Sequence, residues 1–145
     1  SPAQVKDLVQ ANADLEGLAE HRDEAVADVK RTLSALDAAG LCAPGTVQVS
    51  EYPIAERDDQ GRLVLGVIDF VTMVQGEAWI IDFKTDAPPD GPVGPAYLEY
   101  VAQVRTYGRL LGTTGVVAGR RLRCGLLFTA DGGIRWVDVL REDLR

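Results

Sequence analysis

The sequence predicts a single α/β domain with a mixed central sheet flanked by helices, in the order α-β-β-β-α-β-β. Three observations predict this class: an apolar stripe at helical spacing near the start, three β-rich segments in succession, and a second helical segment followed by two strands. The 145 residues, taken as one domain over 1–145, are 46% hydrophobic and 26% charged, which is a globular composition. No stretch approaches the ~18 apolar residues that span a bilayer, so we expect no membrane partner.

The first helix is expected from Asp14 to Ala39. Apolar residues recur there every three or four positions, and Gly40 and Pro44 follow as helix-ending residues. The stripe consists of Leu15, Leu18, Val26, Val29, Leu33 and Leu36.

The remaining elements follow from β-rich runs and from turn residues between them. A loop rich in proline separates the third strand from the second helix, and Asp131-Gly132-Gly133 forms the last turn. The expected strands are Val47–Ala55, Leu63–Val74, Glu77–Lys84, Arg121–Phe128 and Ile134–Leu140, the loop is Asp86–Pro95, and the helix runs from Pro95 to about Leu111.

Charge is distributed unevenly along the chain. The net charge is −7, yet residues 101–145 carry 8 basic and 4 acidic side chains. This last third could form a local phosphate-binding face, and the alternative is a solvated helix face and strand edge. The arginines concerned are Arg105, Arg109, Arg120, Arg121 and Arg123.

Two cysteines, Cys42 and Cys124, exclude a four-cysteine zinc or iron–sulfur site built from this chain alone. A disulfide stays open from sequence. With no secretory signal in the sequence, two free thiols and a cytoplasmic location are the preferred interpretation.

Two carboxylates are predicted to face each other in the second hairpin. If Gln75-Gly76 is a two-residue turn, Val74 pairs with Glu77, and the same register places Asp69 opposite Asp82. Their Cβ atoms would lie about 5 Å apart. Side chains alternate along a strand, so Lys84 shares the face of Asp82.

Opposed carboxylates among apolar neighbours need compensation, because like charges repel and burial penalises them further. A divalent cation, Mg²⁺ or Mn²⁺, would supply it, since both prefer oxygen ligands. Lys84 could neutralise part of the charge or position a water for attack on a phosphate. The alternative is a structural Asp–Lys pair in a hairpin that has slipped by one residue.

Four other residues are weaker candidates when each is taken alone. His21 lies roughly 90° from the centre of the apolar stripe, and could be a ligand or a partly exposed helix residue. Glu51 shares a strand face with Val47 and Val49, and could point inward or be an edge-strand charge. Gln103 and Tyr107 share a helix face, where they could contact a phosphate or simply pack.

Taken together, these residues resemble the RecB-type branch of the PD-(D/E)XK nucleases. The branch pattern is G-x-x-D, then D-[YF]-K-[TS], then Q-x-x-x-Y on the following helix, with an upstream G-x-x-x-H and an acidic residue on the first strand. The matching segments are Gly66–Asp69, Asp82–Thr85, Gln103–Tyr107, Gly17–His21 and Glu51. The likeness is greatest to the C-terminal nuclease domain of AddA/RecB helicase-nucleases, which follows a UvrD-like motor.

The resemblance implies a restriction-endonuclease-like core and metal-dependent hydrolysis of DNA phosphodiesters, of the exonuclease type, in bacterial DNA end processing, recombination and double-strand break repair. His21, Asp69, Asp82 and the backbone carbonyl of Phe83 would ligate Mg²⁺ or Mn²⁺, with Lys84 orienting the attacking water and Glu51 supporting the metal. Gln103 and Tyr107 would contact the DNA backbone, and Arg105 and Arg109 are further candidates. The chain, which opens Ser1-Pro2 without methionine, would be excised from a larger helicase-nuclease.

Two departures from the family pattern qualify the resemblance. Ile68, rather than proline, precedes Asp69, and two cysteines place the chain with relatives that lack an iron–sulfur cluster. A non-catalytic nuclease-fold module for DNA binding or scaffolding is the main alternative, and an unrelated α/β domain with structural carboxylate pairs is a third. Convergence of His21, Asp69 and Asp82 in space distinguishes them.

Overall fold

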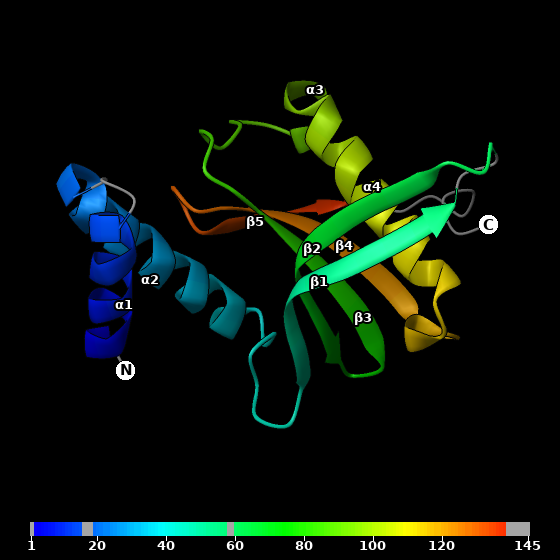
Figure 1. Ribbon diagram of the computed structural model, residues 1–145, viewed down its shortest axis with the longest axis horizontal. Coiled ribbons are helices and arrows are strands. Elements are labelled where there is room, and N and C mark those ends of the chain that lie inside the picture. The colour runs from blue at the N-terminus through cyan, green and yellow to red at the C-terminus, as the bar shows by residue number, and fades with distance from the viewer. Residues whose placement is uncertain (1, 16–18, 58–59, 139–145) are drawn as a thin grey trace.

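The computed structural model describes residues 2–15, 19–57 and 60–138, and it is an α/β fold with a five-stranded mixed sheet flanked by helices (Figure 1). The helices are α1 (Pro2–Leu15), α2 (Arg22–Ala38), α3 (Val93–Ala96) and α4 (Leu98–Thr113), with 3-10 turns η1 (Ala19–His21) and η2 (Gly115–Val117). The strands are β1 (Val47–Arg57), β2 (Leu63–Val74), β3 (Glu77–Lys84), β4 (Arg121–Phe128) and β5 (Gly133–Val137).

The sheet order follows the chain order, β1-β2-β3-β4-β5. Antiparallel pairing joins β1, β2 and β3, and also β4 to β5, whereas β3 and β4 are parallel. A parallel pair needs a long crossover, which α3 and α4 supply. The β2–β3 turn is the predicted pair Gln75-Gly76, with φ of 51° and 82°, the left-handed values that a tight hairpin requires.

The first helix differs from its prediction. The stripe expected from Asp14 to Ala39 belongs to two helices, because α1 ends at Leu15 and α2 begins only at Arg22, after η1. Asp23 and Glu24 in the first turn of α2 suit the positive end of a helix dipole, which explains a start at this point. Residues 16–18, including Gly17 of the predicted motif, lie outside the described residues.

The second helix is also divided. A short α3 precedes α4, and Tyr97 between them has φ −139° and ψ 66°, outside the helical region. Strands β2, β3 and β4 have the predicted bounds. Strand β5 ends at Val137, and residues 139–140 of the predicted last strand lie outside the described residues.

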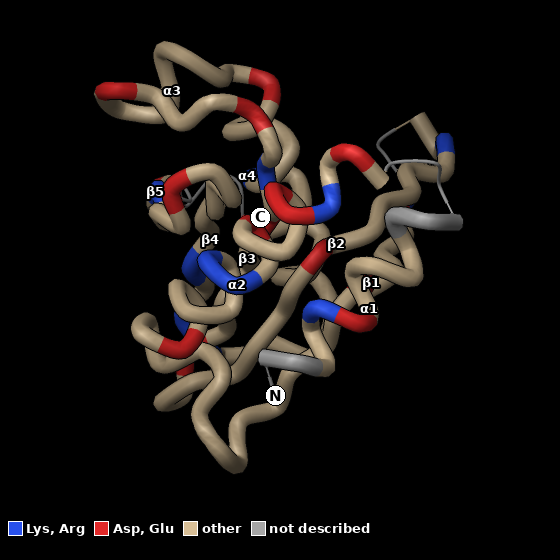
Figure 2. Tube along the Cα trace, turned by 90° about the vertical axis from the view of Figure 1, so that its left-hand side faces the viewer, with Lys and Arg blue, Asp and Glu red and all other residues tan. Residues whose placement is uncertain are grey.

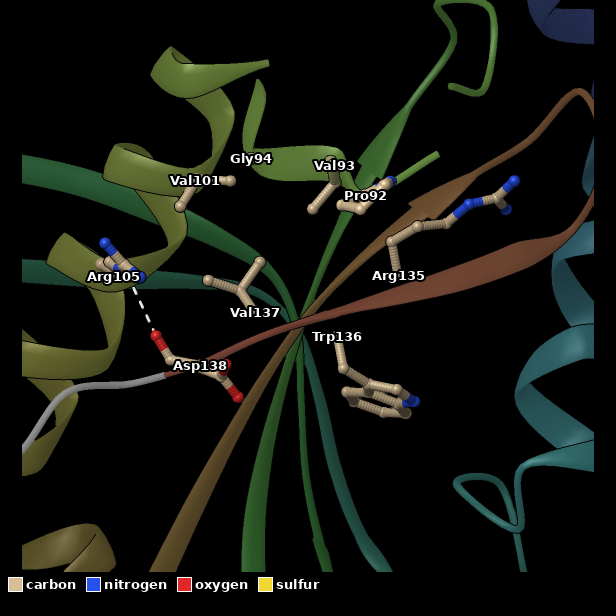
Figure 3. Close-up of a pocket in the computed structure, with 9 residues that line it drawn as sticks. All are labelled: Pro92, Val93, Gly94, Val101, Arg105, Arg135, Trp136, Val137 and Asp138. Carbon is tan, nitrogen blue, oxygen red and sulfur yellow. Dashed lines mark hydrogen bonds between the residues drawn. The ribbon is translucent and has the colours of Figure 1, made fainter. Parts of the chain in front are cut away.

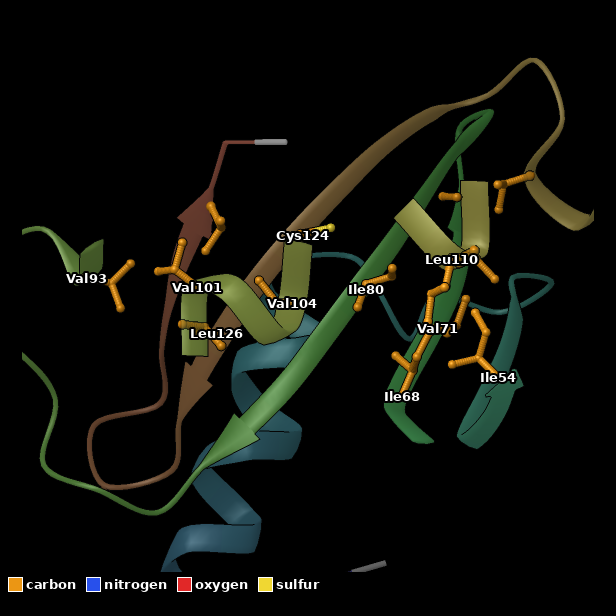
Figure 4. Close-up of a cluster of buried hydrophobic side chains, with 14 of the residues drawn as sticks. Ile54, Ile68, Val71, Ile80, Val93, Val101, Val104, Leu110, Cys124 and Leu126 are labelled. Atoms are coloured by element: carbon orange, nitrogen blue, oxygen red, sulfur yellow. The ribbon is translucent and has the colours of Figure 1, made fainter. Parts of the chain in front are cut away.

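The main core lies between α4 and one face of the sheet (Figure 4). Buried side chains from α4 interlock with side chains of all five strands, which fixes the helix across the sheet. These residues include Ile54, Ile68, Val71, Ile80, Val104, Leu110, Leu126, Phe128 and Val137.

A smaller core lies on the opposite face of the sheet. It contains Leu36 from the end of α2, Leu41 from the following turn, and Phe70, Ile81 and Leu127 from the strands. Farther along α2 the attachment is polar: Arg31 Nε donates to the Thr129 carbonyl at 3.0 Å, and the Thr129 hydroxyl donates to Asp28 at 3.0 Å. A mainly apolar cavity of about 500 Å³ lies between α2 and the sheet.

None of the helices in the described ranges combines the length and the apolar character needed to cross a membrane.

Candidate functional site

The β2–β3 hairpin has the predicted register, with pairs from Val74–Glu77 to Phe70–Ile81. The paired ladder stops one position before Asp69 and Asp82. There, Asp69 Oδ2 accepts a hydrogen bond from the Phe83 backbone N–H at 2.7 Å. The two carboxylates therefore stand on adjacent strands at the point where those strands part.

Asp82 is a buried acid, only 3% exposed. Its Oδ2 lies 2.6 Å from Lys84 Nζ. The contact lacks hydrogen-bond alignment, and this oxygen has no hydrogen-bond partner among the described residues. Burial raises the pKa of Asp82, contact with Lys84 opposes that rise, and the nearby charge of Asp69 adds to it.

Lys84 connects Asp82 to α4. Its Nζ donates to Gln103 Oε1 at 3.0 Å, and the Gln103 amide donates to the Tyr107 hydroxyl at 3.0 Å. The ammonium also lies 4.0 Å from the centroid of the Tyr100 ring, a cation–π contact. Gln103 and Tyr107 thus lie beside Lys84, on the one helix face to which their four-residue spacing directs them. Their contact with DNA stays a prediction.

Two residues that the sequence did not assign to the site support Tyr100. The Tyr100 hydroxyl donates to Asp86 at 2.6 Å, which raises the pKa of Tyr100 to about 12, and the Tyr97 ring stacks on it at 5.1 Å. The sequence does contain a signal for Tyr97 and Tyr100, because they precede Gln103 and Tyr107 at intervals of three or four residues, which brings such residues to one side of a helix. The segment that carries Asp86 and α3 bears acidic charges and no lysine or arginine over residues 85–104 (Figure 2).

Glu51 stands across from Asp69 in the register of β1 and β2, between the pairs Ser50–Phe70 and Tyr52–Ile68. Its φ is 54°, a left-handed value that a glutamate rarely adopts. The left-handed residue reverses the alternation of side chains, because Val49 pairs with Val71 and Tyr52 with Ile68, and both partners belong to the α4-side core.

The predicted faces of the first strand are therefore wrong beyond Val49. Glu51 does not continue the face of Val47 and Val49, and its side chain is exposed. Glu51 still falls opposite Asp69 between the pairs of β1 and β2, and Asp82 follows the last pair of β2 and β3 by one position.

His21 is not brought to the carboxylates. Its side chain is 61% exposed at the start of α2, 3.6 Å from Glu20 and 3.9 Å from Glu24. Over the described ranges, no group of three or more His, Cys, Asp or Glu side chains is arranged to hold a metal ion. The predicted convergence of His21 with Asp69 and Asp82 is therefore absent from this arrangement.

Arg105 and Arg109 also have other partners. Arg105 Nε donates to the Asp138 carbonyl at 3.0 Å and lines a pocket of about 300 Å³ between α4 and β5 (Figure 3). Arg109 pairs with Glu56 of β1 at 2.9 Å.

No protein-family model matches the chain, and a search of curated proteins finds no similar sequence.

Asp69 and Asp82 suit a hard divalent cation. They supply carboxylate oxygens from adjacent strands, and the buried Asp82 Oδ2 has an ion pair with Lys84 but no aligned hydrogen bond among the described residues. Mg²⁺ is commonly bound through one or two carboxylates, with water and substrate phosphate completing its shell. Two carboxylates are therefore a sufficient protein donor set for that ion.

Proposed function

We propose that this chain is a Mg²⁺- or Mn²⁺-dependent deoxyribonuclease domain with a restriction-endonuclease-like core. Its reaction is phosphodiester hydrolysis of the exonuclease type, beside a UvrD-like helicase motor, in DNA end processing, recombination and double-strand break repair. One observation carries the proposal: Asp69 and Asp82 lie on adjacent strands, with Lys84 against Asp82 and held by Gln103.

Different residues of the site would bind the cation and orient the attacking water. Asp69 and Asp82 would hold the cation, with the Phe83 carbonyl as a further oxygen donor. A bound cation would polarise the phosphoryl oxygen and lower the pKa of water. Lys84, kept in place by Gln103 and the Tyr100 ring, would orient the attacking water.

A non-catalytic module of the same fold is the second candidate, and the position of His21 favours it. With His21 exposed and apart, the site has two carboxylates rather than the three-residue ligand set of the resemblance. In that case the Asp82–Lys84 contact is a structural ion pair.

A cleavage assay distinguishes the two candidates. Linear single- and double-stranded DNA is incubated with Mg²⁺, Mn²⁺ or EDTA, using wild type, Asp82→Asn and, as a control, Asp90→Asn on an exposed loop. Asparagine keeps the shape of Asp82, so loss of activity reports on charge rather than on packing. Metal-dependent cleavage by wild type and Asp90→Asn, abolished in Asp82→Asn, is the expected result.

Lys84 and His21 are tested separately by calorimetry of Mn²⁺ binding beside the same assay. Lys84→Ala should abolish cleavage while Mn²⁺ still binds, because the lysine acts on water rather than on the metal. Retained cleavage would remove Lys84 from the mechanism. If His21→Ala cleaves like wild type, the two-carboxylate site suffices; if it loses both Mn²⁺ binding and cleavage, α2 must move to the site. A wild-type chain that binds no Mn²⁺ supports the non-catalytic module.

A further inference from the structure

The two tryptophans of the chain meet on the sheet face opposite α4. Trp79 lies on β3, Trp136 on β5, and Arg123 on β4 between them. Trp79 packs against the smaller core, on the side of the sheet that α2 partly covers. We call Trp79, Arg123 and Trp136 the Trp–Arg platform.

The platform is a preformed aromatic stack. The two indole rings meet edge to face with centroids 5.0 Å apart, and the Arg123 guanidinium lies 4.4 Å from one centroid and 4.5 Å from the other. Gly125 makes room for this arrangement, because a Cβ there would lie 3.0 Å from the Trp136 ring. Substitution at Gly125 would displace the ring from its place beside Trp79.

The platform also keeps unused binding capacity. Trp136 is 39% exposed, which is high for a tryptophan packed on a sheet. The Trp79 Nε1–H is buried without a hydrogen-bond partner among the described residues, although a buried indole N–H usually finds one. An arginine stacked on indole rings still directs N–H groups outward, where they match phosphate oxygens.

The charge around the platform is basic in an otherwise acidic chain. Arg120 and Arg121 precede Arg123 at the start of β4, and both are exposed. Glu77 offsets one of these charges, at 3.6 Å from Arg121. Aromatic rings beside several arginines match the requirements of single-stranded nucleic acid, which stacks its bases on rings and places its phosphates near cations.

We propose that the Trp–Arg platform binds single-stranded DNA, at a place distinct from the carboxylate site. The choice of DNA over another polyanion rests on the proposed function, whereas the stacking argument does not. Trp79 is three residues before Asp82 on β3, and its side chain faces the other side of the sheet. The bound DNA is therefore anchored about 10 Å along β3 from Asp82, on the sheet face opposite the carboxylates. The platform holds the DNA without placing it in the cleavage site.

Tryptophan fluorescence tests the proposal directly, because both tryptophans of the chain belong to the platform. An oligothymidylate of ~12 nucleotides is titrated into the protein in EDTA, which prevents metal-dependent cleavage. We expect quenching, and roughly tenfold weaker binding for Arg123→Gln and Trp136→Leu. Binding should be unchanged for Arg57→Gln, whose arginine lies on β1, at the opposite edge of the sheet from β5. Arg123→Gln keeps both rings, so it remains informative if Trp136→Leu fails to fold.

Three outcomes would overturn the platform: no quenching, equal affinity for Arg123→Gln and wild type, or equal affinity for a duplex, whose bases are not free to stack. An oligoglutamate peptide that binds as tightly as the oligothymidylate would also overturn it, and would assign the surface to a protein partner. Asp82→Asn separates this proposal from the proposed function, because the platform predicts that it loses no oligothymidylate binding whether or not the wild type cleaves DNA.

Discussion

At the scale of single residues, the absence of a side chain at Gly66 determines where Tyr107 lies. A Cβ on Gly66 would approach Tyr107 Cε1 to 2.7 Å, which is closer than carbon atoms pack. Tyr107 cannot move freely, since its hydroxyl accepts the Gln103 amide hydrogen bond, and Gln103 in turn holds Lys84. Gly66 thus influences the position of Lys84 through three successive contacts: Gly66 with Tyr107, Tyr107 with Gln103, and Gln103 with Lys84.

Gly66→Ala is therefore expected to destabilise the fold by about 1–3 kcal/mol through overpacking. In a Tyr107→Ala background the same change should be neutral or stabilising by about 0.5–1 kcal/mol, because alanine suits a strand better than glycine. Chemical denaturation of the four proteins in this double-mutant cycle measures the coupling. Additive effects would show that the two residues do not touch.

At the scale of elements, two residues other than glycine adopt left-handed backbone angles in the β1–β2–β3 meander. Gln75 begins the tight turn, and Glu51 reverses the side-chain alternation of β1 beside Asp69. A turn requires such a conformation, but the middle of a strand does not. Unfavourable backbone geometry inside a strand commonly marks a functional position.

Glu51→Gly should stabilise the protein by about 1 kcal/mol, because glycine adopts positive φ without the steric penalty that other residues incur. The same variant should lose nuclease activity if Glu51 supports the metal. Gln75→Gly is the matched control, since it relieves the same backbone strain at a turn away from the site, and should stabilise without loss of activity. Thermal unfolding and the cleavage assay measure both effects.

The β4–β5 turn carries the clearest pH dependence. Asp131 accepts hydrogen bonds from Arg135 and from the Gly133 backbone N–H at 2.7 Å, and the contact with Arg135, the larger cause, lowers the pKa of Asp131 despite slight burial. Because folding lowers the pKa of Asp131, the ionised carboxylate stabilises the folded protein at pH values above the pKa of about 3.9 that aspartate has in an unfolded chain. This stabilisation is lost as the pH falls through the pKa of Asp131 in the folded protein.

Asp131→Asn should therefore reduce the unfolding free energy by about 0.5–1 kcal/mol at pH 7, the range for a partly exposed pair. The difference from wild type should shrink as the pH falls below about 4. Urea titrations at pH 7, 5 and 3 measure it, with Asp90→Asn as a control. A difference that stays constant down to pH 3 would assign the effect to side-chain geometry rather than to charge.

At the scale of the whole molecule, the sheet with α4 and the helical pair α1–α2 are unequally anchored. Strands β3 and β4 are buried among core residues on both faces, whereas α1 contacts chiefly α2 and η1. Among the described residues of α2, Val26 and Leu36 are the only buried ones. Regions with few buried apolar contacts open at lower free energy than the core.

Backbone amides of α1 should therefore exchange with solvent faster than those of β3 and β4 by roughly two orders of magnitude or more. Arg31→Ala, which removes the hydrogen bond to Thr129, should speed exchange in α2 while leaving β3 unchanged. Native-state hydrogen exchange measures both. Uniform exchange across α1 and the sheet would show that the helical pair unfolds only with the core.

The sequence predicts the sheet more accurately than the helices. It predicts only part of the candidate site. Strand bounds and the β2–β3 register followed from alternation and from one turn, which are local signals. The break at Tyr97 and the reversal at Glu51 depend on backbone angles that no composition pattern encodes. The position of His21 depends on how α2 packs on the sheet, which is a tertiary property that helical spacing does not determine. His21 is therefore exposed rather than in a cleft beside the sheet.

Because β3 pairs with β4, which is synthesised only after α4, one edge of β3 stays unpaired for part of protein synthesis. Asp69, Asp82 and Lys84 leave the ribosome before α4 and β4, and at ~5–20 residues per second the delay until Phe128 lasts several seconds. Throughout that interval β3, with its apolar run Ala78–Ile81, is an exposed sheet edge that could pair with another chain. The nascent protein is thus most vulnerable to aggregation when its carboxylates and lysine are already made but not yet enclosed.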